Sequence, residues 1–126
     1  MSANIRQPIP VYASNGEASV IMVYPNLYNL LGEWIGWVTP EREVYSTLGM
    51  YVGFLTNDPR IMRKRSKEDI HPRLPVPPEP PSIKPPALLP LAPLMSEVGF
   101  DTIDVLWECP EDLHTPDTGE LREDMD

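Results

Sequence analysis

The chain has 126 residues, of which 17 are prolines, and a formal net charge of −9 at pH 7. A chain of this length holds one compact domain and little more. The acidic balance argues against general affinity for nucleic acids and acidic membranes, because both are bound through an excess of Lys and Arg. The single cysteine, Cys109, excludes an internal disulfide and a cysteine-based zinc site.

The sequence carries no signal for membrane insertion or secretion. No stretch reaches the roughly 20 apolar residues of a transmembrane helix. The N-terminal residues, MSANIRQPIPVYASNG, lack the apolar run and the small-residue cleavage site of a secretory signal. A lone cysteine suits a reducing compartment. We therefore expect a cytoplasmic protein without a membrane partner.

The first half of the chain repeats a short motif at an interval of 16 or 17 residues. A tyrosine stands four residues before a glycine in each copy. The three pairs are Tyr12 and Gly16, Tyr28 and Gly32, and Tyr45 and Gly49. A fourth copy begins near Arg60 and lacks the glycines. A polar residue, two further residues and a glycine are typical of a type I turn that a left-handed glycine closes. The motif therefore predicts consecutive β-hairpins.

The turn position predicts the cross-strand register of each hairpin. Tyr28 would face Trp34 and Leu27 would face Ile35, and by the same count Tyr45 would face Tyr51. Alternation then assigns two faces to the strands. One face would carry Leu27, Ile35, Trp37, Val44, Val52 and Phe54. The other would carry Tyr28, Trp34, Tyr45 and Tyr51, with Gly36 and Gly53 leaving gaps that aromatic rings can cover.

The aromatic face has two interpretations. It is a surface on which a ligand stacks, or its rings pack between neighbouring hairpins and hold them together. We favour the second. An isolated hairpin is barely stable in water, so the units must pack on one another. We therefore predict an all-β domain over residues 10–65, after a lead-in over residues 1–9. It would contain about four tandem hairpins packed around a pseudo-fourfold axis, a homo-oligomer, or both.

Two rows carry a resemblance to a known family. The residues Tyr28, Gly32, Gly36 and Trp37, and the residues Tyr45, Gly49, Gly53 and Phe54, resemble the motif of the uncharacterised bacterial 4-fold β flower proteins. The similarity covers roughly residues 10–65 and extends to the proline-rich segment that follows. The first row departs from the motif at Val20, where the second glycine belongs. The resemblance implies a fold of four hairpins and no catalytic residues.

A proline-rich arm is predicted over residues 66–95. Most of the prolines fall there, which favours an extended polyproline II conformation. The arm is a spacer or wraps its own domain, or it is a ligand for an aromatic-lined groove of the SH3 or WW kind. Pro75, Pro78 and Pro81 have the P-x-x-P spacing, and Arg73 adds a flanking cation. We favour the first interpretation.

An apolar and acidic segment follows over residues 96–108. Ser96 or Asp101 is predicted to cap a short helix. This segment either docks on the β-domain or is a recognition peptide that gains order on binding. Residues 109–126 are predicted to be a disordered acidic tail. The basic run from Arg60 to Lys67 and the acidic residues after Ser96 are interpreted as solvated surface, attracted to each other within the molecule.

No catalytic constellation is evident in the sequence. His71 and His114 show neither metal-ligand spacing nor a paired nucleophile. Cys109 lies among acidic residues, which disfavour its thiolate. We therefore expect no enzyme activity, no cofactor and no metal site.

The leading hypothesis is a non-enzymatic protein interaction or scaffold module that binds another protein or a second copy of itself. The candidate partner-binding residues are Tyr28, Trp34, Tyr45, Tyr51, Phe100, Ile103, Leu106 and Trp107. Gly16, Gly32 and Gly49 are the structural turn residues. The alternative is a small-molecule or single-stranded nucleic-acid binder that uses the aromatic face with the cations of Arg60–Lys67. Residues 10–65 are expected to stay folded when residues 72–126 are deleted.

Overall fold

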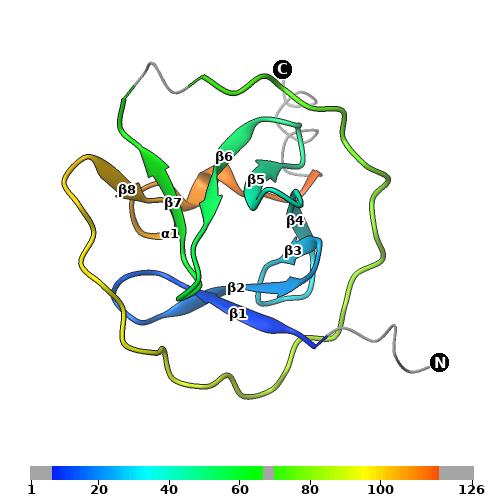
Figure 1. Cartoon of the computed structure of the whole chain (residues 1–126). Helices are drawn as coiled ribbons and strands as arrows, with labels where there is room; N and C mark the ends of the chain where they lie inside the picture. Colours follow the sequence, from blue (N-terminus) through cyan, green and yellow to red (C-terminus); the bar gives the residue numbers. More distant parts are fainter. Residues whose placement is uncertain (1–6, 67–69, 117–126) are drawn as a thin grey trace, which may run out of the picture.

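A computed structural model describes residues 7–66 and 70–116 of the chain. Eight antiparallel strands form one meander sheet, in which each strand pairs with the next along the chain. They are β1 (Ile9–Tyr12), β2 (Ala18–Val23), β3 (Asn26–Tyr28), β4 (Trp34–Val38), β5 (Glu43–Ser46), β6 (Tyr51–Leu55), β7 (Ile61–Lys64) and β8 (Thr102–Asp104). The sheet curls into a half-barrel (Figure 1). The predicted all-β class is confirmed. Among the described residues, no helix is long and apolar enough to cross a membrane.

The repeated glycines close the three hairpin turns that the sequence predicts. Gly16, Gly32 and Gly49 have φ angles of 93°, 86° and 83°. In each turn the glycine amide donates to the carbonyl oxygen three residues earlier, at 2.9 to 3.0 Å. The Asn29 side chain accepts hydrogen bonds from the amides of Leu31 and Glu33 and so braces the second turn. A hydrogen-bonded turn with a left-handed closing glycine is therefore present in all three repeats.

In the β3–β4 and β5–β6 hairpins, a bulge changes the predicted register beyond the residue pair nearest the turn. Tyr28 pairs with Trp34 and Tyr45 pairs with Tyr51, as predicted. Leu27, however, pairs with Gly36 and not with Ile35. In the next hairpin, Val44 likewise pairs with Gly53, so Val52 is the extra residue. A bulge places two residues of one strand opposite one residue of its partner, which the turn motif does not reveal.

The bulge also corrects the predicted faces. Ile35 packs in the main core, whereas Trp37 lies in the aromatic cluster and Val38 takes the interior position. In β6, Leu55 rather than Phe54 joins the core, and Phe54 is only partly buried. Alternation still holds beyond the bulge, but it starts from the opposite side of the sheet.

The second glycine of the two later motifs allows neighbouring strands to approach closely. A Cβ atom on Gly36 would lie 2.6 Å from the carbonyl oxygen of Tyr45, and one on Gly53 would overlap the carbonyl oxygen of Met62. Backbone atoms of the adjacent strand therefore occupy the space that the sequence analysis assigned to aromatic rings.

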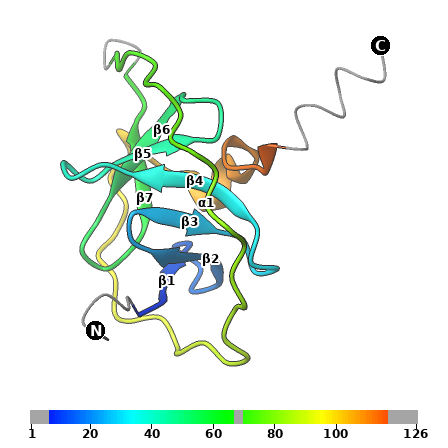
Figure 2. The ribbon, with the colours of Figure 1, turned by 90° about the vertical axis from the view of Figure 1, so that its right-hand side faces the viewer.

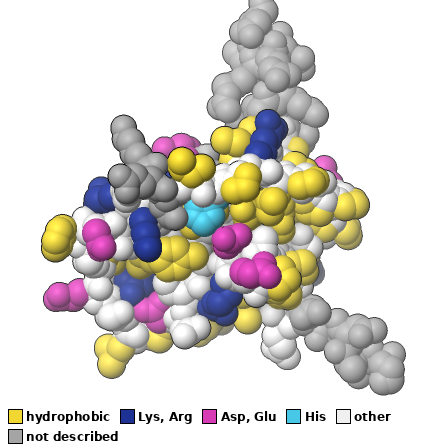
Figure 3. Space-filling model, turned by 45° about the horizontal axis from the view of Figure 1, so that its top comes forward, with side chains coloured by type: hydrophobic (Ala, Val, Ile, Leu, Met, Phe, Trp, Pro, Cys, Tyr) yellow, Lys and Arg dark blue, Asp and Glu magenta, His cyan; other side chains and the backbone are white. Residues whose placement is uncertain are grey.

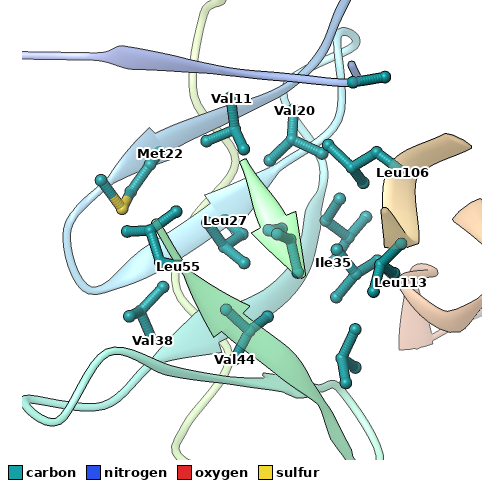
Figure 4. Packing of buried hydrophobic residues seen from close by; sticks show 14 residues of the cluster. Val11, Val20, Met22, Leu27, Ile35, Val38, Val44, Leu55, Leu106 and Leu113 are labelled. Atoms are coloured by element: carbon teal, nitrogen blue, oxygen red, sulfur yellow. The ribbon is translucent and has the colours of Figure 1, made fainter. Parts of the chain in front are cut away.

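The core is aliphatic and lies inside the curl of the sheet. Figure 4 shows Val11, Val20, Leu27 and Val44 pointing toward one another. Leu106 and Leu113 close the cluster from α1 (Val105–Glu108) and from the residue after the 3₁₀-helix η2 (Pro110–Asp112). Leu113 is buried, so residues 109–116 do not form the disordered tail that was predicted. The remainder of that tail, residues 117–126, lies outside the described residues.

The last strand comes from the C-terminal segment. β8 pairs antiparallel with β7, and the whole proline-rich arm lies between these two strands in the sequence. Asp104, and neither Ser96 nor Asp101, stands at the N-cap of α1, and its side chain makes no capping bond. The buried Asp104 carboxylate instead accepts a hydrogen bond from the Ser14 amide at 2.6 Å. This bond joins β8 to the first hairpin turn.

Candidate functional site

The proline-rich arm runs around the outside of the curled sheet (Figures 1 and 2). Its backbone is bonded to two of the hairpin turns: the Leu74 amide donates to the Gly49 carbonyl oxygen (3.0 Å) and the Ile83 amide donates to the Gly32 carbonyl oxygen (2.9 Å). Further along, the Tyr12 hydroxyl donates to the Pro90 carbonyl oxygen at 2.8 Å. Of the interpretations left open by the sequence, the structure has the arm wrapped on its own domain.

The burial of the arm has a period of three residues. Every third residue from 71 to 98 is partly buried, and the residues between are exposed, with Pro85 as the exception in this stretch. The inward residues are His71, Leu74, Pro77, Pro80, Ile83, Pro86, Leu89, Ala92, Met95 and Val98. A polyproline II helix has three residues per turn, so one edge of it faces the domain along the whole arm.

The same period defines two outward edges. Pro72, Pro75, Pro78 and Pro81 follow one another on the first edge, and all four are exposed. We call them the proline edge. The second edge includes Leu88, Leu91 and Leu94, whose side chains are 88, 93 and 101 % exposed. We call them the leucine edge.

The aromatic residues of the repeats form one cluster beneath the arm. Tyr28, Trp34, Trp37 and Tyr45 are buried, and Leu74 and Ile83 of the arm pack against the cluster. The Trp37 and Tyr45 rings are stacked, with centroids 5.5 Å apart. Burial raises the pKa of Tyr28 and Tyr45, and the nearby Glu43 raises that of Tyr45 further. This arrangement favours the structural interpretation of the aromatic face.

His71 begins the arm with an aromatic contact. Its ring stacks on Tyr51 with a centroid distance of 3.6 Å, and its Nδ1 atom lies 3.4 Å from a Glu43 carboxylate oxygen. His71 is partly buried by these contacts. Within the described parts of the chain, His, Cys, Asp and Glu side chains form no group of three that could hold a metal ion.

The basic run is largely neutralised inside the molecule. Arg63 pairs with Asp112 at 2.7 Å and Arg65 pairs with Glu108 at 3.3 Å, as the predicted attraction between basic and acidic runs requires. Burial alone would lower the pKa of Arg63, but the hydrogen bond and charge of Asp112 outweigh it and raise the pKa. On the face shown in Figure 3, Lys and Arg are interspersed with Asp and Glu. Lys67 lies outside the described residues.

Arg63 also changes the surroundings predicted for Cys109. Its Nη2 atom lies 3.5 Å from the Cys109 sulfur, so a cation neighbours the thiol together with the acidic residues. The carboxylates near Cys109 in the sequence did not indicate this contact.

Arg60 is the most buried cation of the run, and its side chain is 4 % exposed. It forms an ion pair with Asp58 at 2.8 Å and donates to the Ser14 hydroxyl (2.8 Å) and the Ser96 carbonyl oxygen (2.9 Å). These bonds join the β6–β7 loop to the first hairpin turn and to the end of the arm. Arg60 is therefore a structural cross-link that the sequence analysis had grouped with surface cations.

The Asp58→Asn variant is expected to lose about 2–4 kcal/mol of stability at pH 7, because it leaves the buried Arg60 without a counter-charge. Burial alone would raise the pKa of Asp58, but hydrogen bonds from Arg60 and Thr56 and the charge of Arg60 leave it below its ordinary value. A lowered folded-state pKa stabilises the fold above about pH 4, and this contribution is lost as the pH falls further. Urea unfolding measures this. The difference in the free energy of unfolding between wild type and Asp58→Asn should be smaller at pH 3 than at pH 7.

Glu41→Gln is the matched control, because Glu41 is an exposed carboxylate in another loop. It should change stability by less than about 0.5 kcal/mol at either pH. An Asp58→Asn variant as stable as wild type at pH 7 would contradict the assignment.

The predicted recognition residues of the C-terminal segment have different positions. Leu106 is a core residue and Ile103 is partly buried, so neither is freely offered to a partner. Phe100 and Trp107 are exposed by 94 % and 56 %. The segment thus docks on the β-domain through Ile103 and Leu106, while Phe100 and Trp107 face outward.

Two clefts border the arm. One, of about 380 Å³, is lined by Asp58 and Arg60 on one side and by residues 96–99 on the other. The other, of about 520 Å³, lies between the arm at Pro75–Pro78 and the strands around Trp37, and no charged side chain lines it. We call the second one the proline–tryptophan cleft.

Fold and arm together define an all-β protein whose curled antiparallel sheet is encircled by its own proline-rich segment. Comparisons with protein-family models, curated proteins and solved structures find no match to this chain. The resemblance to the 4-fold β flower proteins therefore stays a prediction.

Proposed function

We propose that the protein is a non-enzymatic scaffold in which a ring of four hairpins holds a polyproline arm and displays it to another protein. The pairs β1–β2, β3–β4, β5–β6 and β7–β8 supply the four hairpins, in the pseudo-fourfold arrangement that the resemblance to the 4-fold β flower proteins implies. The lone, partly buried Cys109 supports a cytoplasmic location.

The exposed proline edge carries this proposal. Its four prolines recur at intervals of three, so they form one straight ridge on the outward side of the arm. Domains of the SH3 and WW kind bind such a ridge in aromatic-lined grooves. The Gly32 and Gly49 carbonyls fix the arm on the domain at Ile83 and Leu74 before any partner binds. The ordering entropy that a free peptide loses on binding is therefore largely absent.

Arg73 supports the same class of partner. It stands two residues before Pro75, and its Nε atom donates to the Leu48 carbonyl oxygen at 2.8 Å. That bond holds a cation between Pro72 and Pro75, next to the Pro75–Pro78 motif.

Titration of labelled SH3 and WW domains with the full chain tests the proposal. We expect chemical-shift changes in the aromatic groove of at least one domain, with micromolar to millimolar affinity. Pro78→Ser should weaken binding about tenfold, because Pro78 belongs to two of the three P-x-x-P motifs of the proline edge. Ser82→Ala is the control, because Ser82 is exposed on the other edge. Equal binding by wild type and Pro78→Ser would refute the proposal, as would no binding by any domain.

The alternative function has less support. A stacking surface for single-stranded nucleic acid needs open rings beside free cations. Tyr28, Trp34 and Tyr45 are buried beneath the arm, and Arg60 is held in an ion pair.

A further inference from the structure

The leucine edge is an apolar ridge held in place on the surface. Its three leucines are almost fully exposed, and the polyproline period spaces them by about 9.3 Å. The Tyr12 hydroxyl holds the backbone at Pro90, and Arg60 holds it at Ser96. The side chains therefore cannot turn inward without breaking these bonds. An apolar ridge that is exposed to solvent in this way is typical of a contact surface for another molecule.

The ridge lies in an uncharged part of an otherwise acidic chain. Residues 85–96 contain no Asp, Glu, Lys or Arg, although the whole chain has a net charge of −9. A partner surface for this ridge must therefore be apolar and uncharged, because a charged partner would be desolvated without gaining an ion pair.

The proline–tryptophan cleft is a surface of that chemistry on the same chain. Tyr24, Pro25, Trp37 and Pro40 line it from the domain, and Pro75 and Pro78 line it from the arm. Its volume of about 520 Å³ is in the range of ligand-binding clefts. Aromatic rings are also the usual lining of grooves that accept polyproline segments.

We propose that the leucine edge of one molecule docks in the proline–tryptophan cleft of a second copy. The ridge cannot fill the cleft of its own chain, because the leucines point away from the domain on which their arm is anchored. If each copy inserts its ridge into the other, the two contacts form a closed pair with twofold symmetry.

The area of the ridge predicts weak, reversible association. Three leucines bury roughly 180–360 Å² at the usual area coefficient, against about 800 Å² per partner in a stable interface. Even the reciprocal pair stays below that size. Monomers should therefore predominate in dilute solution, and pairs should form as the concentration rises.

Sedimentation equilibrium of the full chain over a wide concentration range tests the proposal. The apparent mass should rise from monomer toward dimer, and it should rise further in high salt, because salt screens the repulsion between two chains of charge −9. Leu91→Asp should weaken association at least about tenfold, since it places a charge in the apolar contact. Leu91 is exposed, so this variant should keep the wild-type unfolding midpoint.

Two further variants make the outcome decisive. Ser82→Asp adds the same charge to the same edge three turns earlier and should leave association unchanged. Pro40→Asp places the charge in the cleft and should weaken association as much as Leu91→Asp. A chain that stays monomeric throughout, as when the ridge serves a different protein, would overturn the proposal. So would a Pro40→Asp variant that associates normally. The Leu91→Asp result does not depend on SH3 or WW binding, so the two proposals fail separately.

Discussion

A chain that ends at Met95 is expected not to fold. The deletion removes β8, which pairs with β7, and the buried residues Val105, Leu106 and Leu113. Burying an aliphatic side chain contributes about 1.5–3 kcal/mol, so these three contribute roughly 4.5–9 kcal/mol. That sum is comparable with the whole stability of a typical domain, about 5–15 kcal/mol. The expectation that residues 10–65 fold alone is therefore revised, because the sheet and its core are completed from the C-terminal segment.

Circular dichroism and urea unfolding measure this effect. The chain ending at Met95 should lack a cooperative transition. A chain ending at Pro116 is the control, because it retains every contact described above and should unfold near the wild-type midpoint. A cooperative transition of the shorter chain at the full-length midpoint would show that β8 and α1 are dispensable.

Gly32→Ala is expected to cost about 3–5 kcal/mol and to lift the arm from the second hairpin turn. A left-handed alanine costs about 1–2 kcal/mol by itself. In addition, its Cβ would overlap the carbonyl oxygen of Ile83, so the arm must move away. The Ile83 amide then loses its bond to the Gly32 carbonyl oxygen, and the Ile83 side chain is exposed to water.

Gly16→Ala is a matched control for this variant. Gly16 has the same turn geometry and a φ of 93°, but a Cβ there meets no atom within 4 Å. It should show the strain alone, about 1–2 kcal/mol. Denaturant unfolding gives both values, and hydrogen exchange at the Ile83 amide should accelerate only in Gly32→Ala. Equal losses in the two variants would mean that the arm contributes nothing at this turn.

The hairpin turns were predictable because their chemistry is local. A left-handed backbone position selects glycine, so Gly16, Gly32 and Gly49 mark three turns without reference to the rest of the fold. The Thr39–Glu43 turn was not predicted, because no glycine marks it. Arg42 occupies its left-handed position with a φ of 68° and leaves no glycine signal. In this conformation the Arg42 side chain donates hydrogen bonds to the Leu55 and Thr56 carbonyl oxygens.

The irregular, strand-free course of the arm was also readable, because proline restricts its own backbone and that of the preceding residue. The points at which the arm attaches to the domain could not be predicted. Leu74 and Ile83 are bonded to glycine carbonyls 25 and 51 residues earlier in the chain. No local pattern specifies such pairs, and the three-residue period of burial became visible only against the surface that the arm encircles.

Local backbone preference therefore accounts for the all-β class, the three glycine turns and the extended arm. Tertiary contacts decided the remainder. The bulge at Ile35 turned Trp37 toward the aromatic cluster, and the bulge at Val52 brought Leu55 into the core. In addition, β8 joined the sheet across the whole arm, and Arg60 became a buried cross-link. Each of these features depends on groups that are distant in sequence and meet only when the sheet curls. The contacts that stabilise them therefore do not exist within any short segment, and no local pattern predicts them.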